Sequence, residues 1–332
     1  MRIQEIRLRR QPQGRVAASD FELADVTLPV LGPGDVLVRN AWMSVDPYMR
    51  LLMTGQEGFV PQKRPGDVMD GAAIGLVERS KHPDFPVGTA VRSMFGWRSH
   101  FVASGGALAA VDDRGAPLSW HLGLLGLTGV TAWLGIERVL RPRTGETILV
   151  SGAAGAVGSI AVQLARRRGV RVLATCSSAE KARWLLETTG VHAALNYREE
   201  TVEGFLNREA PDGLDCYFDN VGGDLLDRTL PHMKAYGRVG LCGAMAQYET
   251  GDYRRGPVNF FAAIERSLTL TGFNAFLLSG DDNAEIVREL NSLARDGRIQ
   301  AHETVVEGLQ NAGKAFSELF DRGNPGKVVI KI

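Results

Sequence analysis

The sequence predicts an α/β protein with two domains: an irregular β domain, and a doubly wound parallel sheet with helices on both faces. Three observations predict this fold class. The chain has 332 residues, which is longer than a single hydrophobic core usually grows. Its first part, to about Ala110, contains short segments rich in Val, Ile and Ala between glycines and prolines. Beyond that part, strand-like and helix-like segments alternate, as in parallel sheets.

The N-terminal part shows no clear helical periodicity and several strand candidates. These candidates cover residues 35–40 (DVLVRN), 70–80 (DGAAIGLVERS), 88–93 (GTAVRS) and 99–104 (SHFVAS). Short strands at close spacing predict a small β-barrel-like domain.

The second part predicts the parallel sheet. Strand candidates cover 146–151, 171–175, 192–197 and 237–244, with an apolar stretch at 214–223; helix candidates cover 157–168, 178–190 and 224–233, with a further segment at 200–210. An amphipathic helix is expected at 283–297, and 309–332 indicates helix, turn and final strand. Propensity alone leaves open whether this tail joins the sheet of the second domain or returns to the first.

Composition excludes several function classes. The 38 basic and 38 acidic side chains balance, so neither nucleic acid nor a membrane surface is an expected partner. The N-terminus lacks the pattern of a secretory signal and no apolar run is long enough to span a membrane, which favours a cytoplasmic protein. Cys176, Cys216 and Cys242 fit neither a disulfide framework nor a zinc cluster, and are expected to be reduced thiols.

A glycine-rich stretch, VSGAAGAVGS at 150–159, lies near the middle of the chain between a strand and a helix candidate. In that context it predicts a dinucleotide loop. Ala153 stands where the first glycine usually falls, Gly155 would let the backbone approach a pyrophosphate, and Gly158 would allow close packing of helix and strand. A tight turn with small residues for packing alone is the alternative.

The end of the second strand of this sheet indicates which dinucleotide is bound. An NAD site usually has Asp or Glu there, to accept a hydrogen bond from the ribose 2′-hydroxyl. This chain has Cys176, Ser177 and Ser178 instead, with Lys181 nearby and Tyr197 after the third strand. Hydroxyls and a lysine would accept a 2′-phosphate, so NADP(H) is favoured. Alternatively, Lys181 is a solvated surface lysine.

Six segments together resemble one enzyme family: SVDPYMR (44–50), GVTAW (129–133), AAGAVGS (153–159), CYFDNVGG (216–223), GRVGLCGAMAQY (237–248) and GNPGKVVIKI (323–332). They are similar to the zinc-independent medium-chain dehydrogenase/reductases. Within that group the resemblance is to the branch of leukotriene B4 12-hydroxydehydrogenase, prostaglandin reductase and 2-alkenal (double-bond) reductase. The matches span nearly the whole chain in order.

The resemblance implies a GroES-like β-barrel catalytic domain (1–118), an inserted Rossmann domain (119–294), and a C-terminal segment (295–332) that completes the catalytic domain. The insertion would explain why the glycine loop is central in the chain. It also implies NADPH-dependent reduction of the carbon–carbon double bond of small hydrophobic α,β-unsaturated aldehydes and ketones, in a homodimer.

The family's cofactor residues are carried over position by position. Gly155, Ala156, Val157 and Gly158 would hold the pyrophosphate, and Lys181 and Tyr197 the 2′-phosphate. The rest of the cofactor would be lined by Thr131, Asn220, Cys242, Gly243, Ala244, Tyr248, Phe273, Asn274, Ala275 and Asn324. Each of these also has an ordinary explanation in a turn, a core or a helix. Asn274 departs from the family, which usually has an apolar residue there.

The resemblance implies no metal. Zinc-dependent relatives carry a Gly-His-Glu run where this chain has Asp67 and Val68, and the six histidines form no metal-ligand pattern. An enolate oxygen that forms during hydride transfer would then need hydroxyl donors. Tyr48 and Tyr248 are the candidate catalytic hydroxyls, beside the nicotinamide ribose; either tyrosine could instead be a pocket wall. Rival hypotheses are an NADPH:quinone oxidoreductase and a non-catalytic NADPH-binding sensor or structural protein.

Overall fold

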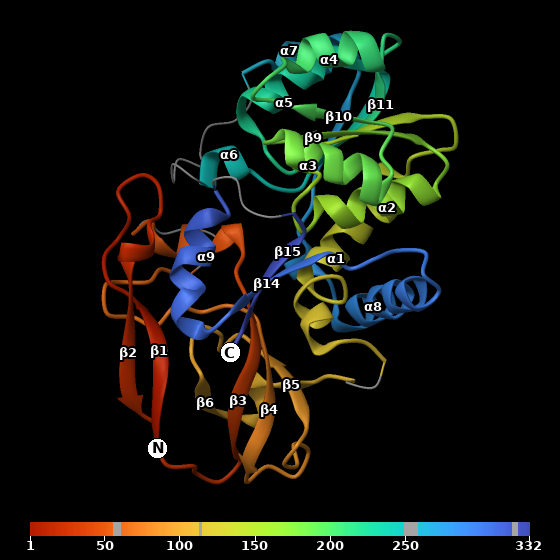
Figure 1. Ribbon diagram of the computed structural model, residues 1–332. Coiled ribbons are helices and arrows are strands. Elements are labelled where there is room, and N and C mark those ends of the chain that lie inside the picture. Colours follow the sequence, from red (N-terminus) through yellow and green to blue (C-terminus); the bar gives the residue numbers. More distant parts are fainter. Residues whose placement is uncertain (56–60, 113–114, 249–257, 321–324) are drawn as a thin grey trace. The chain divides into compact units, whose positions relative to one another are not determined.

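The computed structural model describes residues 1–55, 61–112, 115–248, 258–320 and 325–332 (Figure 1). The chain divides into two compact units. The first, here the β unit, comprises Met1–Leu122, Glu303–Gly323 and Val328–Ile332, and the second, the α/β unit, comprises Gly123–His302 and Asn324–Lys327. The α/β unit is thus an insertion in the chain of the β unit.

The β unit contains two sheets. The smaller pairs β1 (Arg2–Leu8) with β2 (Phe21–Thr27) in antiparallel register. The larger has the order β14-β15-β3-β4-β5-β7, and β6 pairs with β3 outside this path. Its strands are β3 (Asp35–Ser44), β4 (Ala73–Ser80), β5 (Ala90–Ser93), β6 (His100–Ser104), β7 (Ala109–Ala110), β14 (Glu303–Glu307) and β15 (Lys327–Lys331).

Strand β3 organises the larger sheet because it is long enough to hold two partners end to end. Its residues 35–39 pair with β6 and its residues 42–44 pair with β15, both antiparallel. The predicted fold class is confirmed, although the strand pairing within the described ranges gives a branched sheet and no closed barrel. The β15 pairing also answers the question left open for the tail: the final strand joins the β unit.

An aromatic core lies between the small sheet and the C-terminal helix α9 (Ala312–Glu318). Trp97 is fully buried and stacks on Phe21, with ring centroids 5.3 Å apart, and Phe316 meets both rings edge-on. Aromatic pairs in these geometries stabilise a fold beyond what the burial of their apolar surface contributes. The C-terminal helix is therefore part of the core of the β unit.

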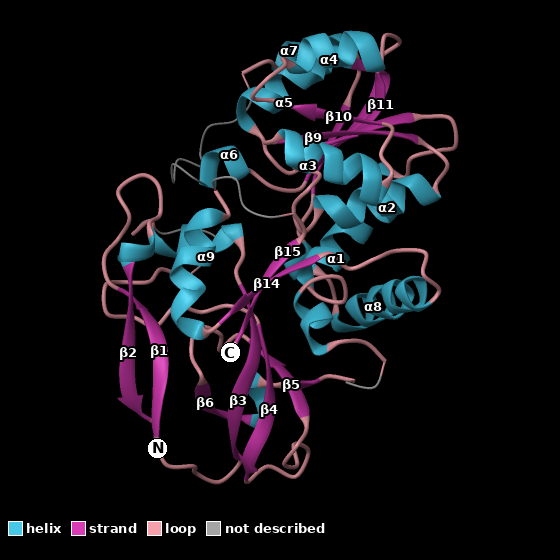
Figure 2. Cartoon of the chain, in the orientation of Figure 1, coloured by secondary structure: helices cyan, strands magenta, loops and turns pink. Residues whose placement is uncertain are grey.

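The α/β unit contains a six-stranded parallel sheet in the order β10-β9-β8-β11-β12-β13. Figure 2 shows α4, α5 and α7 on one side of this sheet and α2 and α3 on the other. The strands are β8 (Thr147–Val150), β9 (Arg171–Cys176), β10 (Ala193–Asn196), β11 (Leu214–Asp219), β12 (Met233–Leu241) and β13 (Thr269–Gly272). This is the predicted doubly wound topology, and the strand order reverses between β8 and β11.

Most helices of this unit are short, and several are followed directly by a π or 3₁₀ turn. They are α1 (Leu127–Trp133), α2 (Gly158–Arg167), α3 (Ala179–Trp184), α4 (Val202–Glu209), α5 (Gly223–Thr229), α6 (Met245–Tyr248), α7 (Phe260–Glu265) and α8 (Gly280–Arg295). Wider π turns follow α1 and α3, at Leu134–Leu140 and Leu185–Thr189. A 3₁₀ turn at Leu230–His232 follows α5, because Pro231 has no N–H to continue it.

No helix in the described part of the chain is both long and apolar enough to cross a membrane.

Candidate functional site

The candidate site of the α/β unit lies at the carboxyl ends of its central strands, where ligands bind in doubly wound sheets. The loop from β8 to α2 begins with Gly152, whose φ of 57° is in the left-handed region that favours glycine. The tight turn is thus made one residue before Ala153, the position assigned from the glycine pattern. Ala153 is fully buried, and its N–H donates to the Thr175 carbonyl at 3.0 Å.

Gly155 and Gly158 have different surroundings in this loop. A Cβ atom at Gly158 would lie 2.4 Å from the Gly152 carbonyl oxygen and 2.6 Å from the Ala153 Cα, so the close packing predicted there is real. A Cβ at Gly155 would have only the Gly152 oxygen nearby, at 3.3 Å, and Gly155 is exposed. Ala156 and Val157 lie between them, just before α2. The N–H groups of Ser159 and Ile160 in the first turn of α2 donate to the carbonyls of Gly155 and Val157, at 2.9 and 3.2 Å. The dipole of α2 favours an anion at this end of the helix.

The buried carboxylate of Asp219 holds the start of the glycine loop in place through hydrogen bonds. Asp219, at the end of β11, is 1% exposed. It accepts hydrogen bonds from Ser151 Oγ at 2.8 Å, Tyr217 Oη at 2.7 Å, and the backbone N–H groups of Val221 at 3.0 Å and Gly222 at 3.1 Å. Burial raises the pKa of the Asp219 carboxyl, and these hydrogen bonds partly offset that shift. Asp219 therefore ties the ends of β8 and β11 together.

Asn220 is part of the same junction. Its Nδ2 donates to the Ser151 carbonyl at 2.7 Å, and its N–H donates to Ser151 Oγ at 2.9 Å. Near the C-terminus, Gly326 forms a parallel β-bridge to Gly155 and donates its N–H to the Ala154 carbonyl at 2.8 Å. Residues 325–327 thus lie against the glycine loop. Asn324, which the resemblance places at the cofactor, is outside the described residues.

The residues predicted for a 2′-phosphate follow the ends of β9 and β10, which are neighbouring strands of the sheet. Ser178 caps α3 by accepting the Lys181 N–H at 3.2 Å, and this turns Lys181 Nζ to within 3.4 Å of Ser177 Oγ. Lys181 is half-buried, and burial lowers its pKa. Tyr197 follows β10 and is 46% exposed. The Lys181 side chain is thus held by a hydrogen bond and partly buried, and is not freely solvated.

Arg198 is a basic residue in this region that sequence reasoning missed. Its positive charge is among the causes that lower the pKa of Lys181, so the two cations lie near each other. Its N–H donates to Asn196 Oδ1 at 3.3 Å. Its position directly after Tyr197 is the signal that could have identified it.

The remaining predicted cofactor residues follow β12 and β13 or lie on α1. Cys242, Gly243 and Ala244 connect β12 to α6, and burial raises the pKa of the Cys242 thiol. Tyr248 ends α6, is half-buried, and has a raised pKa, mainly because of burial. Thr131 Oγ1 donates to the Leu127 carbonyl at 2.7 Å within α1.

The segment after β13 is fixed by packing and by a helix cap. Phe273 meets Phe218 edge-on, with ring centroids 5.8 Å apart. Asn274 Oδ1 accepts the Phe276 N–H at 3.0 Å and caps the 3₁₀ turn that begins at Ala275. These contacts give the polar Asn274 a local structural role at the position where the family usually has an apolar residue.

Tyr48 belongs to the β unit, on the 3₁₀ helix Pro47–Met53. Its pKa is raised, first by burial and then by the negative charges of Asp46 and Asp70. Ser44 Oγ donates to Asp46, and Asp70 forms ion pairs with Lys63 and Arg98. The Tyr48 phenol therefore remains protonated at neutral pH.

The segment that holds zinc ligands in other dehydrogenases has ordinary structural contacts here. Asp67 Oδ2 accepts the Arg64 N–H at 2.8 Å, and Val68 forms a β-bridge with Arg7. In the ranges that the structure describes, no three His, Cys, Asp or Glu side chains are grouped so that they could hold a metal ion.

Comparison with known proteins decides the family. Residues 4–111 match the family described as the N-terminal domain of oxidoreductase, and residues 156–292 match the one described as zinc-binding dehydrogenase. The chain is 38% identical to prostaglandin reductase 1 of Bos taurus over 329 residues, covering 98% of this chain and 97% of the bovine protein. The chain belongs to the zinc-independent medium-chain dehydrogenase/reductase family.

Other members of the family agree with this placement. The 2-alkenal reductase (NADP(+)-dependent) of Nicotiana tabacum is 35% identical over 338 residues, covering 99% of this chain and 97% of the tobacco protein. The crystal structure of CurA in complex with NADPH from Vibrio vulnificus superimposes with a TM-score of 0.93 at 29% identity, covering 99% of this chain and 98% of that one. This medium-chain reductase therefore has the family fold in the part of the chain that the structure describes.

Proposed function

We propose that this chain reduces the carbon–carbon double bond of α,β-unsaturated aldehydes and ketones with NADPH, by hydride transfer to the β carbon and without a metal. The observation that carries the proposal is the end of β9, where Ser177 and the half-buried Lys181 stand in place of a carboxylate. A carboxylate there would repel a 2′-phosphate, whereas a lysine attracts it. The names of the bovine and tobacco relatives support the reaction class.

The described residues fit this coenzyme. Gly155 is exposed and has no side chain, so a pyrophosphate can approach the backbone of the glycine loop, and the dipole of α2 favours an anion there. We propose that Lys181 and Tyr197 bind the 2′-phosphate and that Arg198, whose charge acts on Lys181, adds to the attraction. We propose that Thr131 lies near the nicotinamide and that the rest of the cofactor is lined by Asn220, Cys242, Gly243, Ala244, Tyr248, Phe273, Asn274 and Ala275, together with Asn324, which is outside the described residues.

NADPH, when bound, supplies a hydride to the substrate β carbon, and negative charge then develops on the carbonyl oxygen. We propose Tyr248 as a hydrogen-bond donor to this oxygen, with Tyr48 as the other candidate donor. Since both phenols have raised pKa values, each keeps its proton at neutral pH and stabilises the enolate as a hydrogen-bond donor. A water molecule from solvent then gives a proton to the α carbon and leaves as hydroxide, which completes the reduction.

Lys181→Gln is expected to raise KM for NADPH by about 10- to 100-fold, because a charge-assisted hydrogen bond to phosphate is lost. KM for NADH should change less than about twofold, since NADH lacks the 2′-phosphate. Steady-state kinetics with both coenzymes measures this. Arg183→Gln, an exposed position on the same helix, is the matched control. An equal increase in KM for NADPH and for NADH would contradict the assignment of Lys181 to the 2′-phosphate.

Tyr248→Phe is expected to lower kcat by about 10- to 100-fold with little effect on the KM for NADPH, because an enolate donor is removed. Tyr48→Phe should act in the same direction. As both phenol pKa values are raised, wild-type kcat should show no loss from tyrosine ionisation up to about pH 9. Full kcat in both variants would show that the tyrosines serve as pocket walls only.

A steady-state panel of enals, enones and quinones, each with NADPH and NADH, tests the function directly. The proposal expects turnover of enals and enones with a preference for NADPH. Turnover of quinones alone would establish the quinone oxidoreductase instead. NADPH binding without any turnover would indicate a sensor or structural protein.

We propose that the enzyme is a cytoplasmic homodimer. The free thiols of Cys176, Cys216 and Cys242 support a reducing compartment. Strand β13 is at the end of the described sheet order, and the segments just before and just after it in the chain carry exposed apolar side chains, among them Phe261, Ile264 and Leu277. A free sheet edge with apolar neighbours favours association with a second copy. Sedimentation at twice the 36.0 kDa chain mass would support the dimer, and sedimentation as a monomer would refute it.

A further inference from the structure

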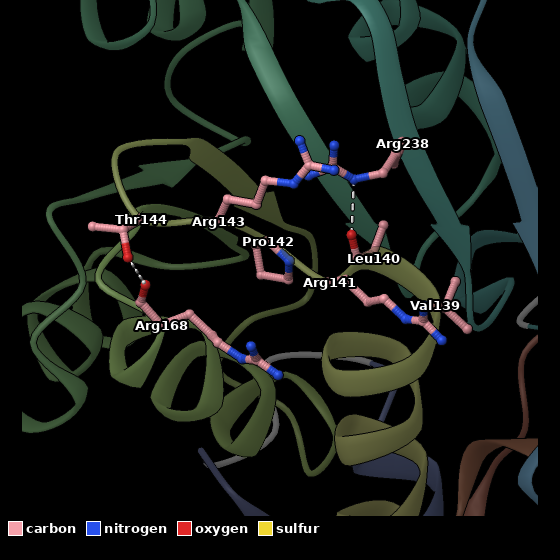
Figure 3. A pocket seen from close by; sticks show the side chains of 8 residues that line it. All are labelled: Val139, Leu140, Arg141, Pro142, Arg143, Thr144, Arg168 and Arg238. Atoms are coloured by element: carbon pink, nitrogen blue, oxygen red, sulfur yellow. Dashed lines mark hydrogen bonds between the residues drawn. The ribbon is translucent and has the colours of Figure 1, made fainter.

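The α/β unit has a basic cavity at the end of the sheet opposite the glycine loop. It has a volume of about 500 Å³ and is lined mainly by the segment 139–144, together with Arg168 and Arg238 (Figure 3). The lining segment precedes β8 whereas the glycine loop follows it, and Arg168 comes just after the last residue of α2. The two sites are thus separated by the length of β8 and α2, about 13–15 Å.

Four arginines from three parts of the chain line this cavity: Arg141, Arg143, Arg168 and Arg238. Two acidic side chains neutralise part of their charge, since Glu137 pairs with Arg168 and Glu146 pairs with Arg238. The remaining two positive charges stand out in a chain whose formal net charge is zero. A concave surface with an excess of one charge concentrates ligands of the opposite charge.

Two of these guanidinium groups are available to a ligand. Arg143 is exposed, and its side chain has no hydrogen-bond or ion-pair partner within the described ranges. In Figure 3 it extends from the loop toward the guanidinium of Arg238. Arg141 uses its Nε to donate to the Arg138 carbonyl at 2.9 Å, which leaves its terminal nitrogens for other acceptors. Guanidinium groups that share a cavity repel each other, and a multivalent anion between them would relieve this repulsion.

The frame that holds these arginines is fixed before any ligand binds. Glu146 Oε2 accepts the Arg143 N–H at 2.8 Å, and Thr144 Oγ1 donates to the Arg168 carbonyl at 3.0 Å. Arg238 Nε donates to the Leu140 carbonyl at 2.8 Å, as Figure 3 shows. Such a preformed site binds without first having to order its backbone.

The cavity is larger than one inorganic phosphate requires, and part of its wall is apolar. Leu140 and the buried Pro142 contribute this wall beside the arginines. Pockets of this volume accept small organic molecules. Arginine binds phosphate through paired N–H donors, which makes phosphate the best match among common anionic groups.

We propose that this cavity is a binding site for a small organic phosphate, separate from the coenzyme site. The phosphate group lies between Arg143 and Arg238, within reach of Arg141 and Arg168, and the organic part lies on Pro142 and Leu140. Nothing in the proposed reduction uses these residues, so the ligand is an additional one.

Calorimetric titration of the full chain with inorganic pyrophosphate, in the presence of saturating NADPH, tests the proposal. NADPH fills the site at the glycine loop, so that only other phosphate sites remain. Wild type is expected to bind pyrophosphate at one site. Arg143→Gln should weaken that binding by about tenfold or more, since one charge-assisted pair of hydrogen bonds is lost. Arg141→Gln should weaken it in the same direction.

The matched control is Arg79→Gln, an exposed arginine on β4 of the β unit, and it should bind pyrophosphate like wild type. Melting temperatures of all variants should equal that of wild type, because the substituted side chains are exposed. The proposal is overturned if wild type binds no pyrophosphate at millimolar concentration, or if Arg143→Gln and Arg141→Gln bind it as wild type does. A preserved NADPH affinity in the variants would confirm that the site is separate.

Discussion

Gly158→Ala is expected to lower the free energy of unfolding by about 3 kcal/mol, because its Cβ overlaps backbone atoms that cannot move aside. The Gly152 carbonyl oxygen and the Ala153 Cα would lie 2.4 Å and 2.6 Å from the added atom. Both belong to the turn that β8 makes into α2. Denaturant titration measures the change in unfolding free energy.

Gly155→Ala is the matched variant, with the opposite expected outcome. Its Cβ would meet only the Gly152 oxygen, at 3.3 Å, so the free energy of unfolding should change by less than about 1 kcal/mol. The added methyl would instead occupy space needed by the pyrophosphate, and the dissociation constant for NADPH should rise at least about tenfold. If Gly155→Ala bound NADPH normally, or Gly158→Ala were as stable as wild type, the description of the loop would be wrong.

Asp219→Ala is expected to destabilise the protein by about 3–5 kcal/mol, since it leaves several buried donors without an acceptor. Ser151, Tyr217 and Gly222 would each lose a hydrogen bond. The β8–β11 junction supports the glycine loop, so NADPH affinity should fall as well. Asp212→Ala, at an exposed turn position, provides the control and should be neutral.

Thermal unfolding and NADPH titration of these variants give the two readouts for Asp219. Asp219→Asn should have an intermediate effect, because the amide retains an acceptor oxygen but adds an N–H group that lacks a matching acceptor. Wild-type stability in Asp219→Ala would show that the buried carboxylate does not hold the junction.

Sequence reasoning succeeded where the signal is local. The alternation of strands and helices predicted the parallel sheet, and glycine spacing placed the loop to within one residue. The register of β9 and β10 pairs Cys176 with Asn196, so the segments that contain Lys181 and Tyr197 leave the sheet at the same edge, and their binding to a 2′-phosphate stays a prediction. These features depend on short segments of chain.

The features that sequence reasoning missed depend on contacts between distant segments. Asp219 accepts a hydrogen bond from Ser151, 68 residues earlier, and although both lie in segments noted in the sequence, nothing in either segment indicates that they meet. The cavity combines Arg143 with Arg238, which no motif connects. Strands β1 and β2 were also not singled out, because charged residues alternate with the few buried apolar ones in Arg2–Leu8. In each case tertiary packing supplies the information.

Hydride transfer from NADPH to the substrate β carbon is tested most directly by following a deuterium label from the coenzyme to the product. NADPH deuterated at the transferable position of the nicotinamide is incubated with the enzyme and an enone, and the product is analysed by NMR. We expect the product to be a saturated ketone with deuterium on its β carbon. An unsaturated alcohol with deuterium on the former carbonyl carbon, or a saturated ketone without deuterium on its β carbon, would contradict it.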